Sequence, residues 1–216
     1  MKVNILDSKK SILNKFISEI RSETAQKDMM RFRRNIERIG EIIAYELSQK
    51  LSYKNDTITT PLGTKIVQTP EKNTVLCSIL RAGLPLHSGL LNYFDDAENA
   101  FISAYRKHIN ETEFEIKVEY FASPSLDDKI LILADPMLAT GQSLVSVYEG
   151  MKQNGAPKEI HIACVIGSNE GIEYIKKHFP ENTTLWIATV DEKLNDKGYI
   201  VPGLGDAGDL CFGEKL

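Results

Sequence analysis

The stretch ILILADPMLATGQSLVSVYEG, residues 130–150, changes character at its centre. It opens with four apolar residues, 130–133, a run typical of a strand that is covered on both faces. An acid, a proline and the small residues ATGQS follow, and apolar residues then recur at helical spacing from Leu144 towards Asn154. The stretch therefore predicts a strand, a tight loop and a helix, which is the repeating unit of α/β proteins.

The same alternation of strand and helix signals extends to both sides of this stretch. Apolar and β-type runs predict three further strands, at 74–80, 160–166 and 183–190. Apolar residues at steps of three and four predict an amphipathic helix over Asp28–Leu51, and Ser168 is suited to cap a second helix that runs through His178. This order favours an α/β fold with a mainly parallel central sheet flanked by helices.

Two hairpins are also predicted. Residues 56–68 have strand-like ends around a Pro-Leu-Gly turn. Residues 101–121 contain two β-type segments on either side of the polar KHINETE, and the second segment alternates apolar and polar residues. We expect this second hairpin to form a projecting β-arm. The chain contains no internal repeat, linker or low-complexity segment, so we expect a single domain over residues 1–216.

The composition argues against several classes of protein. The chain has 216 residues, a formal net charge of −4 and an apolar content of 42%. These values are ordinary for a globular domain and leave no basic surplus for binding nucleic acid or a membrane surface. The three cysteines are widely spaced without a CxxC pair, which favours small buried thiols in a reducing compartment over a zinc site. No apolar run suits a signal peptide or a bilayer span, so we expect a cytoplasmic protein.

The loop after the strand at 130–133 has the features of an anion site. The carboxyl ends of parallel strands open into the crevice where α/β proteins bind ligands. Residues Ala139–Ser143 can turn so that backbone N–H groups converge at the positive end of the next helix. Asp135 beside them repels phosphate but accepts hydrogen bonds from sugar hydroxyls, so together they predict a site for a phosphorylated sugar. A tight turn that Asp135 merely caps fits the spacing equally well.

Two other stretches shift the balance towards a ligand site. Arg81 follows the strand at 74–80 directly and precedes a Gly-containing turn, and its guanidinium suits phosphate oxygens. The alternative is an arginine paired with a surface carboxylate. The tail, GYIVPGLGDAGD at residues 198–209, carries four glycines and two aspartates. Glycines let backbone groups meet a flat ligand edge, although such a composition is also typical of a flexible loop.

The stretches DPMLATGQS, ILRAGL and GYIVPGLGDAGD resemble the signature sequences of uracil phosphoribosyltransferases. The resemblance extends to FRRNIERIGEIIAYE and AYR, and so covers nearly the whole chain. It implies a type I phosphoribosyltransferase fold. It also implies transfer of the 5-phosphoribosyl group from 5-phosphoribosyl 1-diphosphate (PRPP) to N1 of uracil, which gives UMP and diphosphate in pyrimidine salvage.

The resemblance also implies roles for individual residues. Asp135 would take the ribose hydroxyls, and Arg81 and Arg106 would contact the diphosphate. Asp206 would lie between the two substrates and is the candidate catalytic group, with a purely positional role as the alternative. The implied PRPP-binding residues are Arg81, Arg106, Asp135, Pro136, Met137, Leu138, Ala139, Thr140, Gly141, Gln142, Ser143 and Asp206. The implied uracil-binding residues, which act largely through backbone groups, are Ile200, Gly205, Asp206 and Ala207.

The implied reaction calls for a cation. Mg²⁺ is the expected cofactor, bound mainly through PRPP oxygens and water, because no carboxylate cluster in the sequence stands out as a metal cage. Mg²⁺ and arginines would neutralise the charge that develops on the departing diphosphate. Uracil N1 must lose a proton, and the sequence identifies no base for it. The arm at 101–121 would close over the site and exclude water.

Several positions depart from the family pattern. Gln142 stands where a second glycine is usual, Pro85 and Ser88 are unusual in the diphosphate loop, and Leu210 replaces a common basic residue. The arm sequence also differs. None of these changes removes a residue with an assigned substrate contact. The resemblance implies a homodimer or homotetramer, with GTP as a candidate effector.

Two other functions fit parts of the sequence. The first is a phosphoribosyltransferase for another base, or a pyrimidine regulator that binds RNA. The intact tail and the acidic net charge weigh against these. The second is a non-catalytic sensor of PRPP or a nucleotide, which would require damage at Arg81, Asp135 or Asp206. All three residues are present, so the enzyme is favoured.

Overall fold

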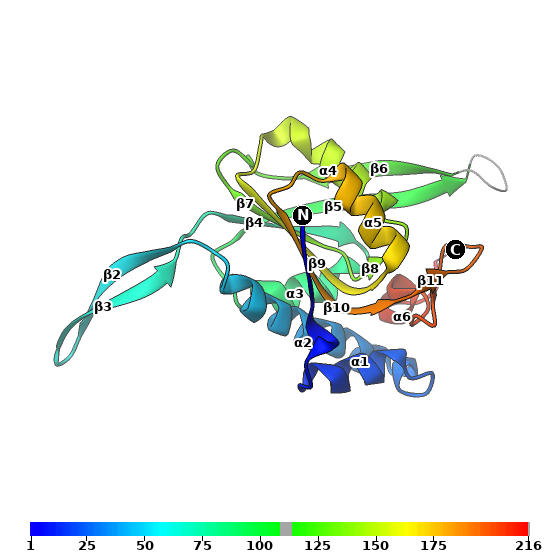
Figure 1. The fold of residues 1–216 in the computed structure, drawn as a ribbon, viewed down its shortest axis with the longest axis horizontal. Coiled ribbons are helices and arrows are strands. Elements are labelled where there is room, and N and C mark those ends of the chain that lie inside the picture. The colour runs from blue at the N-terminus through cyan, green and yellow to red at the C-terminus, as the bar shows by residue number, and fades with distance from the viewer. Residues whose placement is uncertain (109–113, 216) are drawn as a thin grey trace.

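The computed structural model describes residues 1–108 and 114–215, and of residues 104–108 and 114–119 the backbone alone. Within these residues the centre is an eight-stranded sheet in the order β1-β10-β9-β7-β4-β5-β6, with β8 paired to β9 (Figure 1). Its described strand pairs are parallel except β5 with β6, which confirms the predicted sheet. The strands are β1 (Lys2–Ile5), β4 (Thr74–Leu80), β5 (Glu98–His108), β6 (Phe114–Ala122), β7 (Ile130–Ala134), β8 (Met137–Leu138), β9 (Glu159–Ser168) and β10 (Thr183–Asp191).

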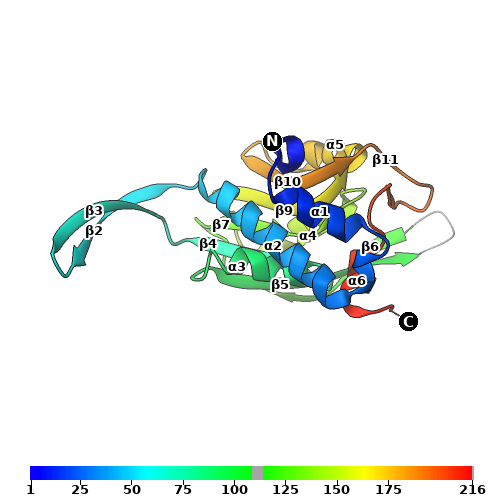
Figure 2. The same ribbon diagram turned by 90° about the horizontal axis from the view of Figure 1, so that it is seen from below.

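Helices cover both faces of the sheet, as Figures 1 and 2 show from two sides. One layer holds α1 (Leu13–Arg21), α2 (Met29–Ser48) and α3 (Gly83–Leu91), and the other holds α4 (Gln142–Met151) and α5 (Asn169–His178). Alternate residues of β7 serve the two layers. Ile130 and Ile132 belong to the core under α1–α3, whereas Leu131 and Leu133 belong to the core under α4 and α5. Burial on both faces explains the continuous apolar run of this strand.

The predicted helices are present with small shifts at their ends. α2 matches the helix predicted over 28–51, and the carboxylate of Asp28 caps it by accepting the Arg31 N–H at 3.0 Å. Ser168 caps α5 as predicted. The helix predicted from Leu144 begins two residues earlier, at Gln142, because Gly141 provides the cap. It ends in a 3₁₀ turn, η3 (Lys152–Asn154).

Several elements were not predicted. The expected turn after Arg81 is in fact the start of α3, whose glycines, proline and apolar residues obscure the helical period because most of its surface is buried. The tail, which had the composition of a flexible loop, folds instead into a short strand and a helix. The missed elements are β1, β8, α1, α3, β11 (Lys193–Leu194), β12 (Ile200–Val201), α6 (Ala207–Phe212), η1 (Leu6–Ser8) and η2 (Ala25–Lys27).

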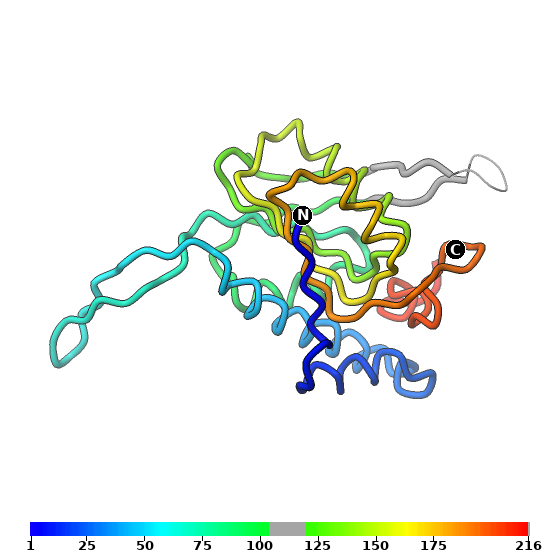
Figure 3. The backbone as a smooth tube through the Cα atoms, in the orientation of Figure 1, coloured from blue at the N-terminus to red at the C-terminus, as the bar shows by residue number. Residues whose placement is uncertain are grey.

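Two hairpins extend from this body. The predicted hairpin is confirmed as β2 (Tyr53–Thr60) and β3 (Gly63–Pro70), which is longer than expected and projects well away from the sheet (Figures 1 and 3). The predicted β-arm is formed by β5 and β6, which pair antiparallel at the edge of the central sheet. Its tip, residues 109–113, lies outside the described residues. No helix in the described part of the chain has the length and apolar character needed to cross a membrane.

Candidate active site

The ends of four parallel strands bring the candidate residues to one edge of the sheet. β10, β9, β7 and β4 are neighbours in that order. β4 leads into Arg81, β7 leads into Asp135, β9 ends at Ser168 and β10 ends at Asp191. The first turn of α3 lies directly against the end of β7, because a side chain at Gly83 would be 2.9 Å from the Ala134 carbonyl oxygen. This edge is where open α/β sheets bind ligands.

The segment at 139–143, here called the cup, comprises the loop that follows β8 and the first two residues of α4. Gly141 has φ +79° and forms the amino-terminal cap of α4, a conformation that favours glycine. A Cβ atom at Gly141 would also lie 3.0 Å from the Gly171 carbonyl oxygen. The cup opens into a small pocket, whose lining residues are Asp135, Met137, Ala139, Thr140, Gly141, Ser143 and Leu144. A phosphate group would meet backbone N–H groups there at the positive end of a ten-residue helix.

Asp135 is one of the residues that line the same pocket. Its side chain is largely buried, and one carboxylate oxygen accepts the N–H of Met137 at 3.1 Å. This is the capping contact that the sequence offered as the alternative to ligand binding. Asp135 therefore makes this capping contact and also lines the pocket, and its binding of the ribose hydroxyls stays a prediction. Pro136 and Leu138, also in the candidate set, are buried and fix the backbone of the loop.

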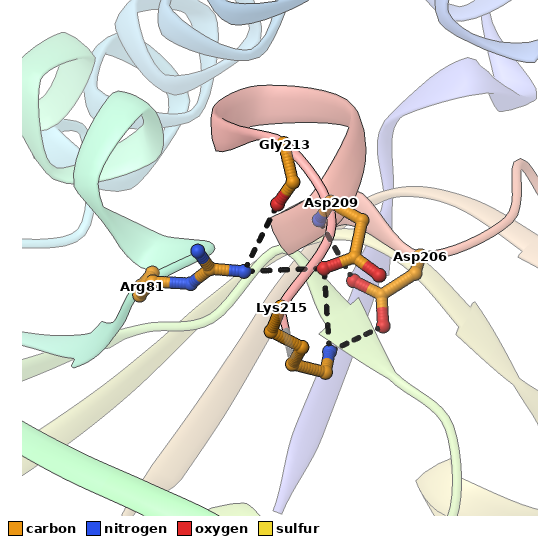
Figure 4. Close-up of polar contacts among 5 residues, drawn as sticks. All are labelled: Arg81, Asp206, Asp209, Gly213 and Lys215. Atoms are coloured by element: carbon orange, nitrogen blue, oxygen red, sulfur yellow. Dashed lines mark hydrogen bonds and ion pairs between the residues drawn. The ribbon is translucent and has the colours of Figure 1, made fainter.

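Arg81 reaches towards the carboxyl-terminal helix (Figure 4). Its peptide bond with Leu80 is cis. The guanidinium donates to the Asp209 carboxylate at 3.1 Å and to the Gly213 carbonyl at 3.4 Å. The pairing with a carboxylate, which the sequence left open for Arg81, is therefore present. The Arg81 side chain is 44% exposed, and an exposed ion pair of this kind contributes about 0–1 kcal/mol.

Asp206 forms a second part of this network. One of its oxygens accepts the Asp209 N–H at 3.0 Å and caps α6, and the other accepts from the Lys215 ammonium at 2.9 Å. Burial raises the pKa of Asp206, but the Lys215 ammonium and backbone N–H groups outweigh burial and hold this pKa below its usual value. A carboxylate held in its ionised form is a weak base at neutral pH. These contacts are those of a positional group, and the catalytic role of Asp206 stays a prediction.

An ion pair that was not predicted from the sequence holds the tail against the body. Arg21 of α1 binds both oxygens of Asp191 at 2.8 Å and also donates to the Gly203 carbonyl at 3.1 Å. Asp191 accepts the N–H of Gly203 at 2.8 Å. Burial raises the pKa of Asp191, but the Arg21 guanidinium and the Gly203 N–H outweigh burial and lower it. An acid at the end of a predicted strand was the available signal, as it was at Asp135.

The uracil candidates lie in the segment that this ion pair fastens. Ile200 and Ala207 are buried, Gly205 is exposed, and Asp206 is half-buried. A side chain at Gly208 would lie 3.9 Å from the Arg81 guanidinium, so the tail and the Arg81 loop are in close proximity. Gly205 has φ +96°, a backbone conformation that other residues rarely adopt. Without a side chain, its backbone groups are open to a ligand.

One predicted residue cannot be compared with the others. Arg106 is in β5, where its backbone pairs with Ile116 of β6. Its side chain lies outside the described residues, so its contact with PRPP stays a prediction. Within the described part of the chain, no group of three or more His, Cys, Asp or Glu side chains is arranged to hold a metal ion.

Comparison of the sequence with known proteins identifies the family of the chain. The family model for uracil phosphoribosyltransferase matches residues 7–214. The uracil phosphoribosyltransferase of Porphyromonas gingivalis is 53% identical over 216 residues, which is 100% of both chains. That of Methanothermobacter thermautotrophicus is 40% identical over 189 residues, 87% of this chain and 86% of the relative.

Solved structures agree on the fold. The AQ2163 protein of Aquifex aeolicus superposes with a TM-score of 0.87 at 28% identity and covers 98% of each chain. A hypoxanthine phosphoribosyltransferase from Staphylococcus aureus covers 74% of each chain with a TM-score of 0.51 at 16% identity, which supports the fold alone. A family model that spans nearly the whole chain, together with relatives of the same name at this identity, leads to one conclusion: the chain belongs to the uracil phosphoribosyltransferase family.

Proposed function

We propose that the cup, Asp135, Arg81 and the tail act together on the reaction of this family. That reaction transfers the 5-phosphoribosyl group of PRPP to N1 of uracil and releases diphosphate, with UMP as the other product. The cup binds the 5′-phosphate, Asp135 accepts from the ribose hydroxyls, and Arg81 binds the diphosphate. The observation that carries this assignment is the convergence of the cup, Arg81 and the tail at one edge of the sheet.

The diphosphate competes with Asp209 for Arg81. The ion pair between Arg81 and Asp209 is exposed and is not bidentate, since the same guanidinium nitrogen donates to the Asp209 carboxylate and to the Gly213 carbonyl. A diphosphate offers two oxygens in the geometry of the guanidinium fork and carries more charge than a carboxylate. We therefore expect PRPP to displace Asp209 at little cost. Arg81 then faces the leaving group, where negative charge grows as the bond to C1′ breaks.

Mg²⁺ fits the donors that the site provides. Asp206 and Asp209 hold the ammonium of Lys215 between them, at 2.9 and 3.5 Å, so this pair attracts a cation. A magnesium ion usually takes one or two carboxylates and fills its remaining positions with substrate oxygens and water. Asp206 and Asp209 are the residues that would hold it. The ion, when bound, supplies positive charge to the diphosphate.

Recognition of uracil rests on the tail. The pyrimidine edge presents an acceptor, a donor and an acceptor at O4, N3–H and O2. Backbone groups of the opposite pattern around Ile200, Gly205 and Ala207 accept this edge and leave cytosine with clashing donors. A site built from fixed polar groups rejects such a mismatch strongly, because its own groups would be left unpaired.

The assembly, regulation and compartment of the protein are further parts of this proposal. A homodimer or homotetramer is supported by the exposed hairpin β2–β3, whose apolar tip residue Leu62 is 99% exposed. Large apolar side chains on a projecting element favour contact with another chain. GTP activation is tested by turnover with and without the nucleotide. A cytoplasmic location fits the three buried cysteines, all of which are free thiols.

The deciding experiment measures UMP and diphosphate from PRPP, Mg²⁺ and each of uracil, cytosine, thymine, hypoxanthine and adenine. We expect turnover with uracil alone, and a loss of at least about 100-fold in Arg81→Ala and Asp206→Ala. Arg34 is a matched control for Arg81, because its side chain is 45% exposed and pairs with Glu37 on the outer surface of α2. Arg34→Ala should keep full activity. Binding of PRPP without turnover of any base would instead support the sensor.

A further inference from the structure

Ser168 links the end of β9, the first turn of α5 and the cup. Its side chain is fully buried. The hydroxyl accepts the N–H of Gly171 at 2.9 Å, which caps α5, and donates to the carbonyl oxygen of Ala139 at 2.7 Å. Capping requires the acceptor alone. The second bond reaches 29 residues back along the chain to the first residue of the cup, and a cap has no need of it.

The cup and α5 also approach each other backbone to backbone. A Cβ atom at Gly171 would lie 2.2 Å from the Ala139 carbonyl oxygen and 2.9 Å from that of Leu138. Further along the cup, a Cβ atom at Gly141 would lie 3.0 Å from the Gly171 carbonyl oxygen. The first turn of α5 therefore forms a rigid wall behind the cup. Ser168 is the side chain that bonds the cup to this wall.

Because a peptide group is planar, the hydrogen bond from Ser168 to the Ala139 carbonyl also sets the direction of the Thr140 N–H. The described chain has two cis peptide bonds, at Leu80–Arg81 and Val201–Pro202, so the bond from Ala139 to Thr140 is trans. In a trans peptide the C=O and the next N–H point in opposite directions. When Ser168 draws the Ala139 carbonyl towards α5, the Thr140 N–H must point away from α5, and Ala139 and Thr140 both line the pocket.

We propose that Ser168 is a positioning residue for PRPP, which turns the Ala139–Thr140 peptide so that the Thr140 N–H faces the 5′-phosphate. This inference rests on the proposed role of the cup as the 5′-phosphate site. Ser168 touches no substrate itself. Its effect should therefore be confined to ligands that carry the phosphate and should leave uracil unaffected.

Three substitutions separate the two bonds of Ser168. Ser168→Ala removes both. Ser168→Asp keeps an acceptor for the Gly171 N–H but cannot donate to the Ala139 carbonyl when ionised, and Ser168→Thr keeps both bonds. As a matched control, Asp28→Ala removes the cap of α2 by deleting an acceptor for the Arg31 N–H. It tests what the loss of a cap does when the cup is not involved.

The experiment measures the dissociation constant of ribose 5-phosphate and the KM values for PRPP and uracil, with thermal unfolding alongside. One hydrogen bond of ordinary strength corresponds to about a fivefold change. We expect Ser168→Ala and Ser168→Asp to weaken ribose 5-phosphate and raise the KM for PRPP by about fivefold or more, with the KM for uracil unchanged. Ser168→Thr should restore both values, and Asp28→Ala should lower the melting temperature alone.

Two outcomes would overturn the inference. One is ribose 5-phosphate binding that is equal in wild type, Ser168→Ala and Ser168→Asp. The other is an equal rise in KM for both substrates, which indicates general loosening of the structure. Failure of the proposed function looks different, because wild-type protein would then bind neither ribose 5-phosphate nor PRPP.

Discussion

The contact between Gly171 and the cup gives a prediction with a magnitude. In Gly171→Ala the new methyl group would lie 2.2 Å from the Ala139 carbonyl oxygen, whereas real Cβ contacts are essentially never below 3.0 Å. The cup and the first turn of α5 must therefore separate by at least 0.8 Å, because the atom in the way belongs to the backbone and cannot rotate aside. A displacement of about 1 Å in a group that orients a substrate costs on the order of 100-fold.

The assay is kcat/KM for PRPP at saturating uracil, with the binding of ribose 5-phosphate as a second measure. We expect kcat/KM to fall by about 100-fold in Gly171→Ala. Gly150→Ala is the matched control, since Gly150 lies in α4 with nothing within 4 Å of an added Cβ. It should keep wild-type activity and gain about 0.5–1 kcal/mol of stability. Wild-type phosphate binding in folded Gly171→Ala would refute the assignment of the cup.

Three further predictions concern stability and reactivity. Asp191→Ala should cost about 3 kcal/mol and raise the KM for uracil, because it leaves Arg21 unpaired and frees the tail. The pKa of Asp191 is lowered in the folded protein, so its contribution to the free energy of unfolding is present at neutral pH and is lost as the pH falls below about 4. An acid unfolding transition that is unchanged in Asp191→Ala would contradict this reasoning. Gly89→Ala should cost about 2–3 kcal/mol in chemical denaturation, since its Cβ would lie 2.0 Å from the Glu37 carbonyl oxygen of α2. The three buried thiols are those of Cys77, Cys164 and Cys211, and burial raises the pKa of each, to about 12 for Cys77 and Cys211. Native protein at pH 8 should therefore resist a thiol reagent that labels the unfolded chain three times. Fast labelling of any one cysteine in the native protein would contradict this prediction.

The central strands and the longest helix could be predicted because local signals suffice for them. β4 coincides with the predicted run at 74–80, and α2 is amphipathic with an acid at its cap. α3 could not be predicted in this way. It is buried on most sides, so its apolar residues do not follow one face, and Pro85 and Gly89 are poor helix formers. The extent of the single domain stays a prediction.

In the candidate site, too, the features that follow from local sequence could be predicted and those that depend on distant contacts could not. The cup and Asp135 were predicted, because strand, loop and helix follow one another within 21 residues of sequence. The sequence left open a carboxylate partner for Arg81, but it identified neither Asp209 as that partner nor Lys215 as the partner of Asp206, since both pairs form only after the tail folds back onto the sheet edge. No local pattern encodes a partner 128 residues away.

This separation along the chain has a consequence for refolding. Arg81 meets Asp209 across 128 residues, and Arg21 meets Asp191 across 170. Contacts of such high order form late, because the entropy of closing long loops is lost before the contacts can compensate for it. Helical circular dichroism should therefore return well before UMP synthesis does. For this enzyme, recovered UMP synthesis marks the completion of folding, and chains that are compact but not fully folded show no activity.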